Sequence, residues 1–266
     1  MDPIQAIVLA LVQGLTEFLP VSSSGHLILV PKFLGWPDQG LPFDIAVHMG
    51  TLAAVVFYFR RDLAAILGAW FKSVAGAPAS SESRLAWAIL IAAIPVAIVG
   101  LLANDTIEGH LRDSPNAVAA ALAFFGLLLW LADRLGRKTL GDAGITWQRA
   151  LFIGCAQALS LLPGTSRSGI TMTAGLALGF TRTTAARFSF LLAVPSIGMA
   201  GAYEGLQLAR GGHAIDWQPI ALGAAVAAVS GFLCIHYFMK LIQRIGMLPF
   251  AIYRWALAAI VVYALH

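Results

Sequence analysis

The sequence predicts an all-α polytopic membrane protein, with six spanning helices and two re-entrant helix hairpins in an inverted-topology repeat. The 266 residues are 59% hydrophobic and only 11% charged, whereas soluble domains average about 25% charged residues. Long apolar runs alternate with short polar loops along the chain, and two runs are interrupted in the same way by Pro, Gly and Ser. We therefore expect a single membrane domain over residues 1–266, with repeats at about 1–140 and 145–266.

The first expected hairpin begins with the apolar run 4–19, which ends where Pro20 and three consecutive serines break the helical pattern. The apolar piece that follows covers only residues 27–34. At about 1.5 Å per residue it reaches about 12 Å, well short of a hydrocarbon core of about 30 Å. Its polar apex, residues 16–26, is therefore expected at membrane depth.

The spanning helices are expected in six further apolar runs. These runs cover residues 43–59, 85–102, 117–135, 188–205, 219–239 and 249–265. A second interrupted pair, 150–162 and 170–180, lies between the third and fourth runs and is separated by PGTSRSG at 163–169. Because 170–180 is again too short to span, a second re-entrant hairpin is expected there.

The two interruptions share one spacing, which supports a repeat. Gln13 and Gly25 are twelve residues apart, and so are Gln157 and Gly169, with a proline and serines between them in both copies. Three spanning helices follow each copy. An odd number of spans between the copies gives them opposite orientations in the membrane.

Lys and Arg placement orients the chain, because positive residues concentrate in cytoplasmic loops. Twelve of these side chains are expected at one face of the bilayer, and three, Lys32, Arg112 and Arg210, at the other. The first face is therefore predicted to be cytoplasmic, which places both termini and the first hairpin toward the outside. The basic residues lie in loops, so the net charge of +4 predicts no nucleic-acid partner.

Polar side chains at the two apices are costly to place in lipid and therefore predict a site. The first apex holds Glu17, Ser22, Ser23, Ser24, Gly25 and His26, and the second holds Thr165, Ser166, Arg167, Ser168 and Gly169, with Thr171 shortly after. A short helix follows each apex, and its free N–H groups suit an anion. Arginine binds phosphate oxygens in a bidentate fork.

This set of groups fits phosphoryl transfer, in which arginine and a metal stabilise charge on the phosphoryl oxygens. A serine would attack or orient water, and His26 would serve as base or nucleophile because an imidazole titrates near working pH. The carboxylate of Glu17 lies near a helix C-terminus, where it needs a positive partner. The candidates are Arg167, a divalent metal ion and a proton. A purely structural ion pair between Glu17 and Arg167 is the alternative interpretation.

Other polar residues within the apolar runs give weaker signals. Asp44 and His48 are four residues apart on one face of the first span, where they either line a cavity or pack helices. Arg254 is near the end of its span and is expected to snorkel to the membrane surface.

The motifs QGLTEFLPVSSSGH (13–26) and LPGTSRSG (162–169) resemble the two signature motifs of the undecaprenyl-pyrophosphate phosphatases, also called bacitracin resistance proteins. The resemblance implies hydrolysis of undecaprenyl pyrophosphate to the monophosphate carrier of peptidoglycan synthesis. It also implies a bacterial plasma-membrane location, with the active site open to the outer side.

The resemblance assigns roles to individual residues. Catalytic roles fall on Glu17, Ser23, His26 and Arg167, and substrate binding on Gln13, Ser22, Ser24, Gly25, Thr165, Ser166, Ser168, Gly169 and Thr171. A divalent cation, Mg²⁺ or Ca²⁺, is expected at Glu17. Gln13 is the neutral variant at the first position of the family's E/Q-x-x-x-E pair, which argues against a two-carboxylate metal site.

A lipid-carrier or anion transporter is the main alternative, since inverted repeats with broken helices are a transporter architecture. The acid, serine and histidine at one apex favour the phosphatase, because anion transport does not obviously require them. A second membrane phosphatase family is disfavoured because no His follows Arg167 at short spacing, and an intramembrane serine protease because no GxSG elbow occurs. Expected partners are the prenyl pyrophosphate lipid and membrane lipids, and a homodimer is left open.

Overall fold

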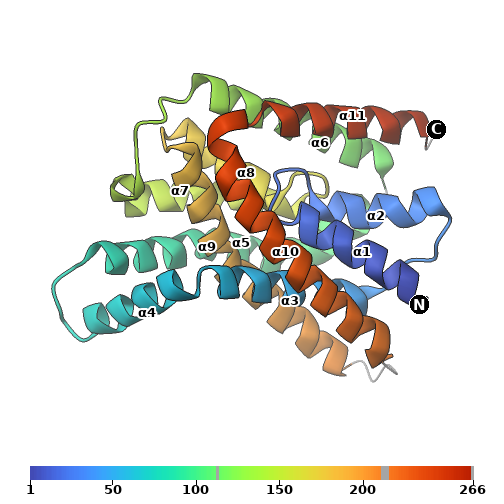
Figure 1. Cartoon of the computed structure of the whole chain (residues 1–266), viewed down its shortest axis with the longest axis horizontal. Helices are drawn as coiled ribbons and strands as arrows, with labels where there is room; N and C mark the ends of the chain where they lie inside the picture. Colours follow the sequence, from blue (N-terminus) through green and yellow to red (C-terminus); the bar gives the residue numbers. More distant parts are fainter. Residues whose placement is uncertain (112–113, 211–215, 265–266) are drawn as a thin grey trace.

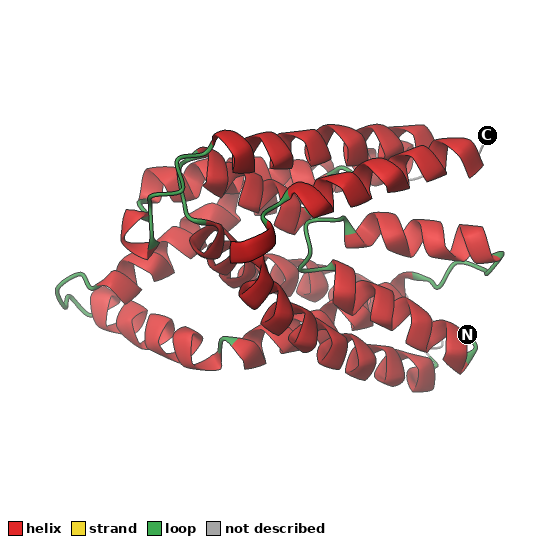
Figure 2. Cartoon of the chain, turned by 45° about the horizontal axis from the view of Figure 1, so that its top comes forward, coloured by secondary structure: helices red, strands yellow, loops and turns green. Residues whose placement is uncertain are grey.

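The structure is a computed structural model that describes residues 1–111, 114–210 and 216–264 (Figures 1 and 2). These residues form a bundle of helices without a β-strand, apart from an isolated bridge between Leu140 and Phe180. Arg112 and residue 265, the end of the last expected span, lie outside the described part of the chain.

The helices fall into two groups along the chain. The first group is α1 (Pro3–Thr16), α2 (Ser23–Leu34), α3 (Leu41–Tyr58), α4 (Arg60–Val74), α5 (Ser81–Leu111) and α6 (Pro115–Leu135). The second is α7 (Trp147–Ala158), α8 (Arg167–Ala177), α9 (Arg182–Arg210), α10 (Trp217–Ile245) and α11 (Leu248–Ala264). Short 3-10 turns, η1 (Asp142–Gly144) and η2 (Leu159–Leu161), lie before and after α7.

Five described helices are long and apolar enough to cross a membrane: α3, residues Ser81–Leu102 of α5, α6, α9 and α10. The prediction of an all-α multi-pass membrane protein is thereby confirmed. The sixth expected span corresponds to α11, which has 17 residues and is shorter than each of the five. Helix length therefore does not confirm the count of six spans.

The short helices form two pairs that approach each other inside the bundle. α1 runs inward from the end of the molecule at which α11 finishes, and α2 returns to that end, whereas α7 and α8 approach from the opposite end (Figure 1). The tips of the pairs are in contact, since Ser168 Oγ in the first turn of α8 donates a hydrogen bond to the carbonyl of Leu19, in the loop after α1, at 2.9 Å. The interrupted segments, 144 residues apart in sequence, therefore meet in space.

Two glycines allow α1 and α3 to pack closely against α10. A Cβ atom added at Gly50 of α3 would lie 2.3 Å from the carbonyl oxygen of Ala224, and one added at Gly14 of α1 would lie 2.9 Å from that of Ala227. Both distances are too short for a side chain. Glycine is therefore needed at these contacts, as is common where membrane helices approach closely.

An aromatic cluster fixes the first apex against the second group of helices. Phe18, directly after Glu17, is fully buried and meets Phe190 of α9 edge to face, with ring centroids 5.4 Å apart. Phe190 in turn contacts Phe238 of α10 at 5.8 Å. Membrane helices are held together by van der Waals packing of this kind, so the position of the apex is set by packing as well as by polar contacts.

Candidate active site

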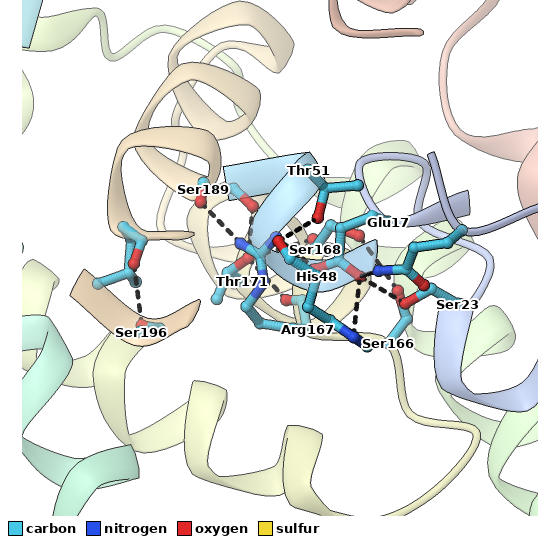
Figure 3. A network of polar contacts seen from close by, with 12 residues as sticks. Glu17, Ser23, His48, Thr51, Ser166, Arg167, Ser168, Thr171, Ser189 and Ser196 are labelled. Carbon is cyan, nitrogen blue, oxygen red and sulfur yellow. Dashed lines mark hydrogen bonds and ion pairs between the residues drawn. The ribbon is translucent and has the colours of Figure 1, made fainter. Parts of the chain in front are cut away.

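Glu17, which follows the last residue of α1, is the centre of a polar cluster between the two apices (Figure 3). Its side chain is only 6% exposed. Oε2 accepts hydrogen bonds from Ser23 Oγ at 2.6 Å and from Gln13 Nε2 at 3.0 Å. Oε1 accepts one from Arg167 Nη2 at 3.1 Å. The carboxylate thus joins a hydroxyl from the first apex to the guanidinium of the second.

Arg167 is the first residue of α8, and α9 holds its guanidinium in place. Nη1 donates to the backbone carbonyl of Ser189 at 3.0 Å, while Nη2 donates to Glu17. Nε is buried and has no hydrogen-bond partner among the described residues. An arginine fixed in this way presents its charge without further reordering, which is the arrangement that stabilises a developing anion.

The two apices share one unusual backbone conformation. Ser22 and Ser166, the residues that cap α2 and α8, both have φ = +73°, which is the left-handed region. Each hydroxyl accepts a hydrogen bond from the backbone N–H three residues later, Gly25 at 3.4 Å and Gly169 at 3.1 Å. A non-glycine residue in this region costs roughly 1–2 kcal/mol. The strained caps directly precede Ser23 and Arg167, the residues that contact Glu17.

The cluster opens into a cavity of about 310 Å³ between α2, α3, α7 and α9. Glu17, Ser23, His48 and Arg167 line it. His48 Nε2 lies 3.8 Å from Glu17 Oε2, and its Nδ1 contacts the backbone carbonyl of Asp44 at 2.7 Å. The sequence left His48 open between lining a cavity and packing helices, and the structure decides for the cavity.

His26 is the predicted catalytic residue that the structure does not bring to this cluster. Its Nδ1 contacts the carbonyl of Ser22 at 2.7 Å and its Nε2 contacts the hydroxyl of Tyr253 at 2.6 Å. The imidazole and phenol rings are stacked, with an interplanar angle of 9°. His26 does not line the cavity. Nδ1 is therefore engaged with the cap of its own helix, and Nε2 joins the start of α2 to α11.

The residues predicted to bind substrate divide into two groups. Ser24 and Ser166 line the cavity. The others lie within the apices or in the adjoining turns of α1 and α8, and are Gln13, Ser22, Gly25, Thr165, Ser168, Gly169 and Thr171. Thr171 Oγ1, for example, donates to the backbone carbonyl of Arg167 at 2.8 Å, so this group supports the residues that reach the cavity.

Arg254 corrects the sequence-based expectation, because it is fully buried and does not snorkel to the membrane surface. Its guanidinium donates hydrogen bonds to five backbone carbonyls. The acceptors are Leu122 at 3.0 Å, Ala121 at 3.4 Å, Pro20 at 3.3 Å, Gly164 at 2.9 Å and Thr165 at 3.0 Å. The broken helices leave carbonyls without helical partners, and a buried carbonyl needs a donor. Arg254 supplies donors to both apices.

Replacing Arg254 with Leu is expected to destabilise the fold strongly. Each buried carbonyl that loses its donor costs about 1–3 kcal/mol, so the loss should exceed about 3 kcal/mol. Thermal unfolding of the purified protein in detergent should show a midpoint lowered by more than about 5 °C. Arg210→Leu, at the exposed end of α9, is the matched control, and an equal midpoint for both variants would contradict the expectation.

A divalent cation fits this site only if a bound ligand supplies some of the coordinating oxygen atoms. Among the described residues there is no group of three or more His, Cys, Asp or Glu side chains that could hold a metal. The cluster supplies the carboxylate of Glu17 and the amide oxygen of Gln13, which is buried and has no hydrogen-bond partner in the described part of the chain. Mg²⁺ is commonly held by one or two carboxylates together with phosphate oxygens. These two oxygen ligands therefore fit a cation whose remaining ligands are phosphate oxygens of a bound ligand.

The chain is similar to a family of known proteins. The family described as "Bacitracin resistance protein BacA" matches residues 6–260. Undecaprenyl-diphosphatase 2 of Stutzerimonas stutzeri (strain A1501) is 55% identical over 263 residues, covering 98% of this chain and 97% of the relative. Undecaprenyl-diphosphatase of Teredinibacter turnerae is 54% identical over 264 residues, covering 99% and 100%. That of Nitrosococcus oceani is 53% identical over 263 residues, covering 99% of each.

Proposed function

The chain belongs to the bacitracin resistance protein BacA family, and from this we propose that it hydrolyses undecaprenyl pyrophosphate to undecaprenyl phosphate and inorganic phosphate. The reaction regenerates the lipid carrier for peptidoglycan synthesis and confers bacitracin resistance. The observation that carries the proposal is the contact of Glu17 with both Ser23 and Arg167 at the wall of one cavity. This places a base, a hydroxyl and a cation around one point, as phosphoryl transfer requires.

We propose that Ser23 is the nucleophile, because its hydroxyl already donates to Glu17 at 2.6 Å. Ser23 Oγ would attack the terminal phosphorus while its proton passes to Glu17 Oε2. The bond from that phosphorus to the bridging oxygen breaks, and undecaprenyl phosphate leaves with the electron pair. Glu17 passes the proton from Ser23 to the departing phosphate oxygen and becomes a carboxylate again. Water then attacks the phosphorus of the phosphoserine while its proton passes to Glu17, the bond from phosphorus to Ser23 Oγ breaks, Oγ takes the proton from Glu17, and inorganic phosphate leaves. Arg167 stabilises the charge on the phosphoryl oxygens in both steps.

His48 and His26 have separate roles in this proposal. His48, 3.8 Å from the carboxylate, keeps Glu17 turned toward Ser23. His26 holds the first turn of α2 against Tyr253 of α11 and thereby positions Ser23, three residues earlier. A nucleophilic His26 is not proposed, because both ring nitrogens are engaged outside the cavity.

A Mg²⁺ or Ca²⁺ ion would be held by the carboxylate of Glu17 and the amide oxygen of Gln13, together with phosphate oxygens of the substrate. When bound, such an ion neutralises charge on the transferring phosphoryl group. The unpartnered Gln13 Oε1 supports this part of the proposal.

We further propose that α11 is a sixth span and that α1–α2 and α7–α8 are re-entrant pairs of an inverted repeat, about 1–140 and 145–266. The identical φ at Ser22 and Ser166 supports the repeat. The enzyme would lie in the bacterial inner membrane with both termini and the cavity toward the periplasm. The cavity wall includes Leu41, the first residue of α3, and Glu204, near the end of α9. Both helix ends lie at the end of the molecule where α1 begins (Figure 1).

The test is release of inorganic phosphate from undecaprenyl pyrophosphate by the purified protein in detergent. We expect release with Mg²⁺ or Ca²⁺ present, its loss on adding a chelator, and its recovery when excess metal is returned. Undecaprenyl phosphate, which has only the phosphate that should remain, is the control substrate and should release none. Absence of hydrolysis with metal present would reject the proposed phosphatase activity. Hydrolysis that survives complete chelation would reject the proposed requirement for a divalent cation.

A further inference from the structure

The second hairpin contains a buried amide, Gln157, at the position that Gln13 has in the first. Gln13 donates its amide N–H to Glu17, four residues later, at 3.0 Å. The residue four positions after Gln157 is Leu161, which has no acceptor in its side chain. Gln157 is 0% exposed, and its Nε2 has no hydrogen-bond partner among the described residues. The repeat has kept the amide donor but lost the carboxylate that it would serve.

An unpaired buried donor is unfavourable for folding. It costs about 1–3 kcal/mol, and most buried polar atoms in proteins are paired. Gln157 lies in the wall of the same cavity as Glu17 and Arg167, and because it is 0% exposed a ligand in that cavity contacts it only after the wall shifts. The missing partner is therefore expected on the ligand rather than on the protein.

The surroundings of Gln157 suit one end of an anionic lipid headgroup. Ser160 and Ser196 also line this part of the cavity, and Ser196 Oγ lies 3.3 Å from Gln157 Oε1. Ile197 and Ala200 provide apolar wall close to Ser196 in sequence. In Figure 3, Ser196 lies apart from the Glu17 cluster, with Arg167 between Ser196 and Ser23. The cavity thus has polar groups in two places and apolar surface beside the second.

We propose that Gln157 donates a hydrogen bond to the substrate phosphate that is not attacked, the one that remains on the prenyl chain. The inference rests on the proposed function, in which Glu17, Ser23 and Arg167 act on the terminal phosphate. The other phosphate must lie in the same cavity. Among the described residues, two buried donors of cavity-lining side chains have no acceptor, Arg167 Nε and Gln157 Nε2, and Gln157 is the one that makes no contact with Glu17. A neutral amide orients this phosphate without the strong attraction of a second cation, which would retain the product.

The test compares Gln157→Met with Gln148→Met, an exposed glutamine on the same helix. Methionine keeps the length of the side chain and removes the donor. It also removes the amide oxygen that accepts from Ser196 Oγ at 3.3 Å, but that hydroxyl keeps the carbonyl of Leu192 as an acceptor at 2.9 Å. Dissociation constants are measured by calorimetry for farnesyl monophosphate, which has a prenyl-linked phosphate, and for inorganic phosphate. A hydrogen bond to a charged group is worth about 1.5–3 kcal/mol, so Gln157→Met should weaken farnesyl monophosphate binding by about tenfold or more. Inorganic phosphate binding should change less than twofold, and Gln148→Met should alter neither.

Stability separates a ligand-binding role from a structural one. Because Gln157→Met removes an unpaired buried donor, its thermal unfolding midpoint should equal or exceed that of the wild type. A lower midpoint with unchanged farnesyl monophosphate binding would overturn the inference, as would equal weakening of both ligands. Gln157→Glu is the second variant, and its added negative charge should weaken farnesyl monophosphate binding further. These binding measurements need no turnover, so a failure of hydrolysis by the wild type would reject the proposed function separately.

Discussion

Replacing Glu17 with Gln is expected to lower kcat/KM for undecaprenyl pyrophosphate by about 1000-fold or more. The amide keeps the shape of the side chain but can no longer take the proton of Ser23, whose hydroxyl it faces at 2.6 Å. A positioned general base contributes about 10²–10⁴-fold, and the substitution also removes the charge that orders Arg167. Phosphate release by the purified variant in detergent measures the effect.

The control for this substitution is Glu82→Gln, at the exposed start of α5. It makes the same chemical change far from the cavity in sequence and should leave kcat/KM within twofold of wild type. A loss of less than tenfold in Glu17→Gln, with the control unchanged, would mean that Glu17 is not the base.

Replacing Arg167 with Met is expected to reduce kcat by about 10³–10⁵-fold, the range for arginines that stabilise phosphoryl-transfer transition states. Arg167→Lys keeps the positive charge but cannot donate to both Ser189 and Glu17 in the observed fork. We therefore expect the lysine variant to fall between wild type and Arg167→Met. Arg210→Met, at the exposed end of α9, is the control for loss of a positive charge.

A double variant separates catalysis from a purely structural ion pair between Glu17 and Arg167. Removing one partner of a buried pair leaves an unpaired charge and costs about 3–5 kcal/mol, whereas removing both is often nearly neutral. Glu17→Gln with Arg167→Met should therefore unfold at a higher temperature than either single variant and still release no phosphate. Recovery of hydrolysis together with stability would show that the pair has only a structural role.

Much of the fold was predictable because a bilayer imposes simple length requirements. Apolar runs of sufficient length predicted the helices that correspond to α3, α5, α6, α9 and α10. The apolar runs that were too short to span the membrane predicted helix pairs broken at Pro20 and Pro163. In the structure α1 ends shortly before Pro20, and α8 begins shortly after Pro163. Whether these pairs are re-entrant, and whether α11 spans, depends on where the membrane lies and stays a prediction.

The side chains were harder to assign than the helices. Glu17, Ser23 and Arg167 were predicted to belong to one site, and the structure brings them into contact. From the sequence, His26 ranked above His48 as a candidate catalytic residue, although each is a polar residue in an apolar helix. Their difference is one of direction, since His26 faces Tyr253 and His48 faces the cavity.

The sequence alone determined that this is a membrane protein with two interrupted segments bearing the groups needed for phosphoryl transfer. Only the tertiary structure decided that Arg254 is buried between the apices and that the Gln157 amide N–H finds no acceptor within residues 1–111, 114–210 and 216–264. The physical reason is that lipid-facing and core-facing positions are both apolar in a membrane helix, so periodicity does not tell them apart. Which polar groups find partners is settled by contacts between segments more than 80 residues apart, such as that of Arg254 with Thr165.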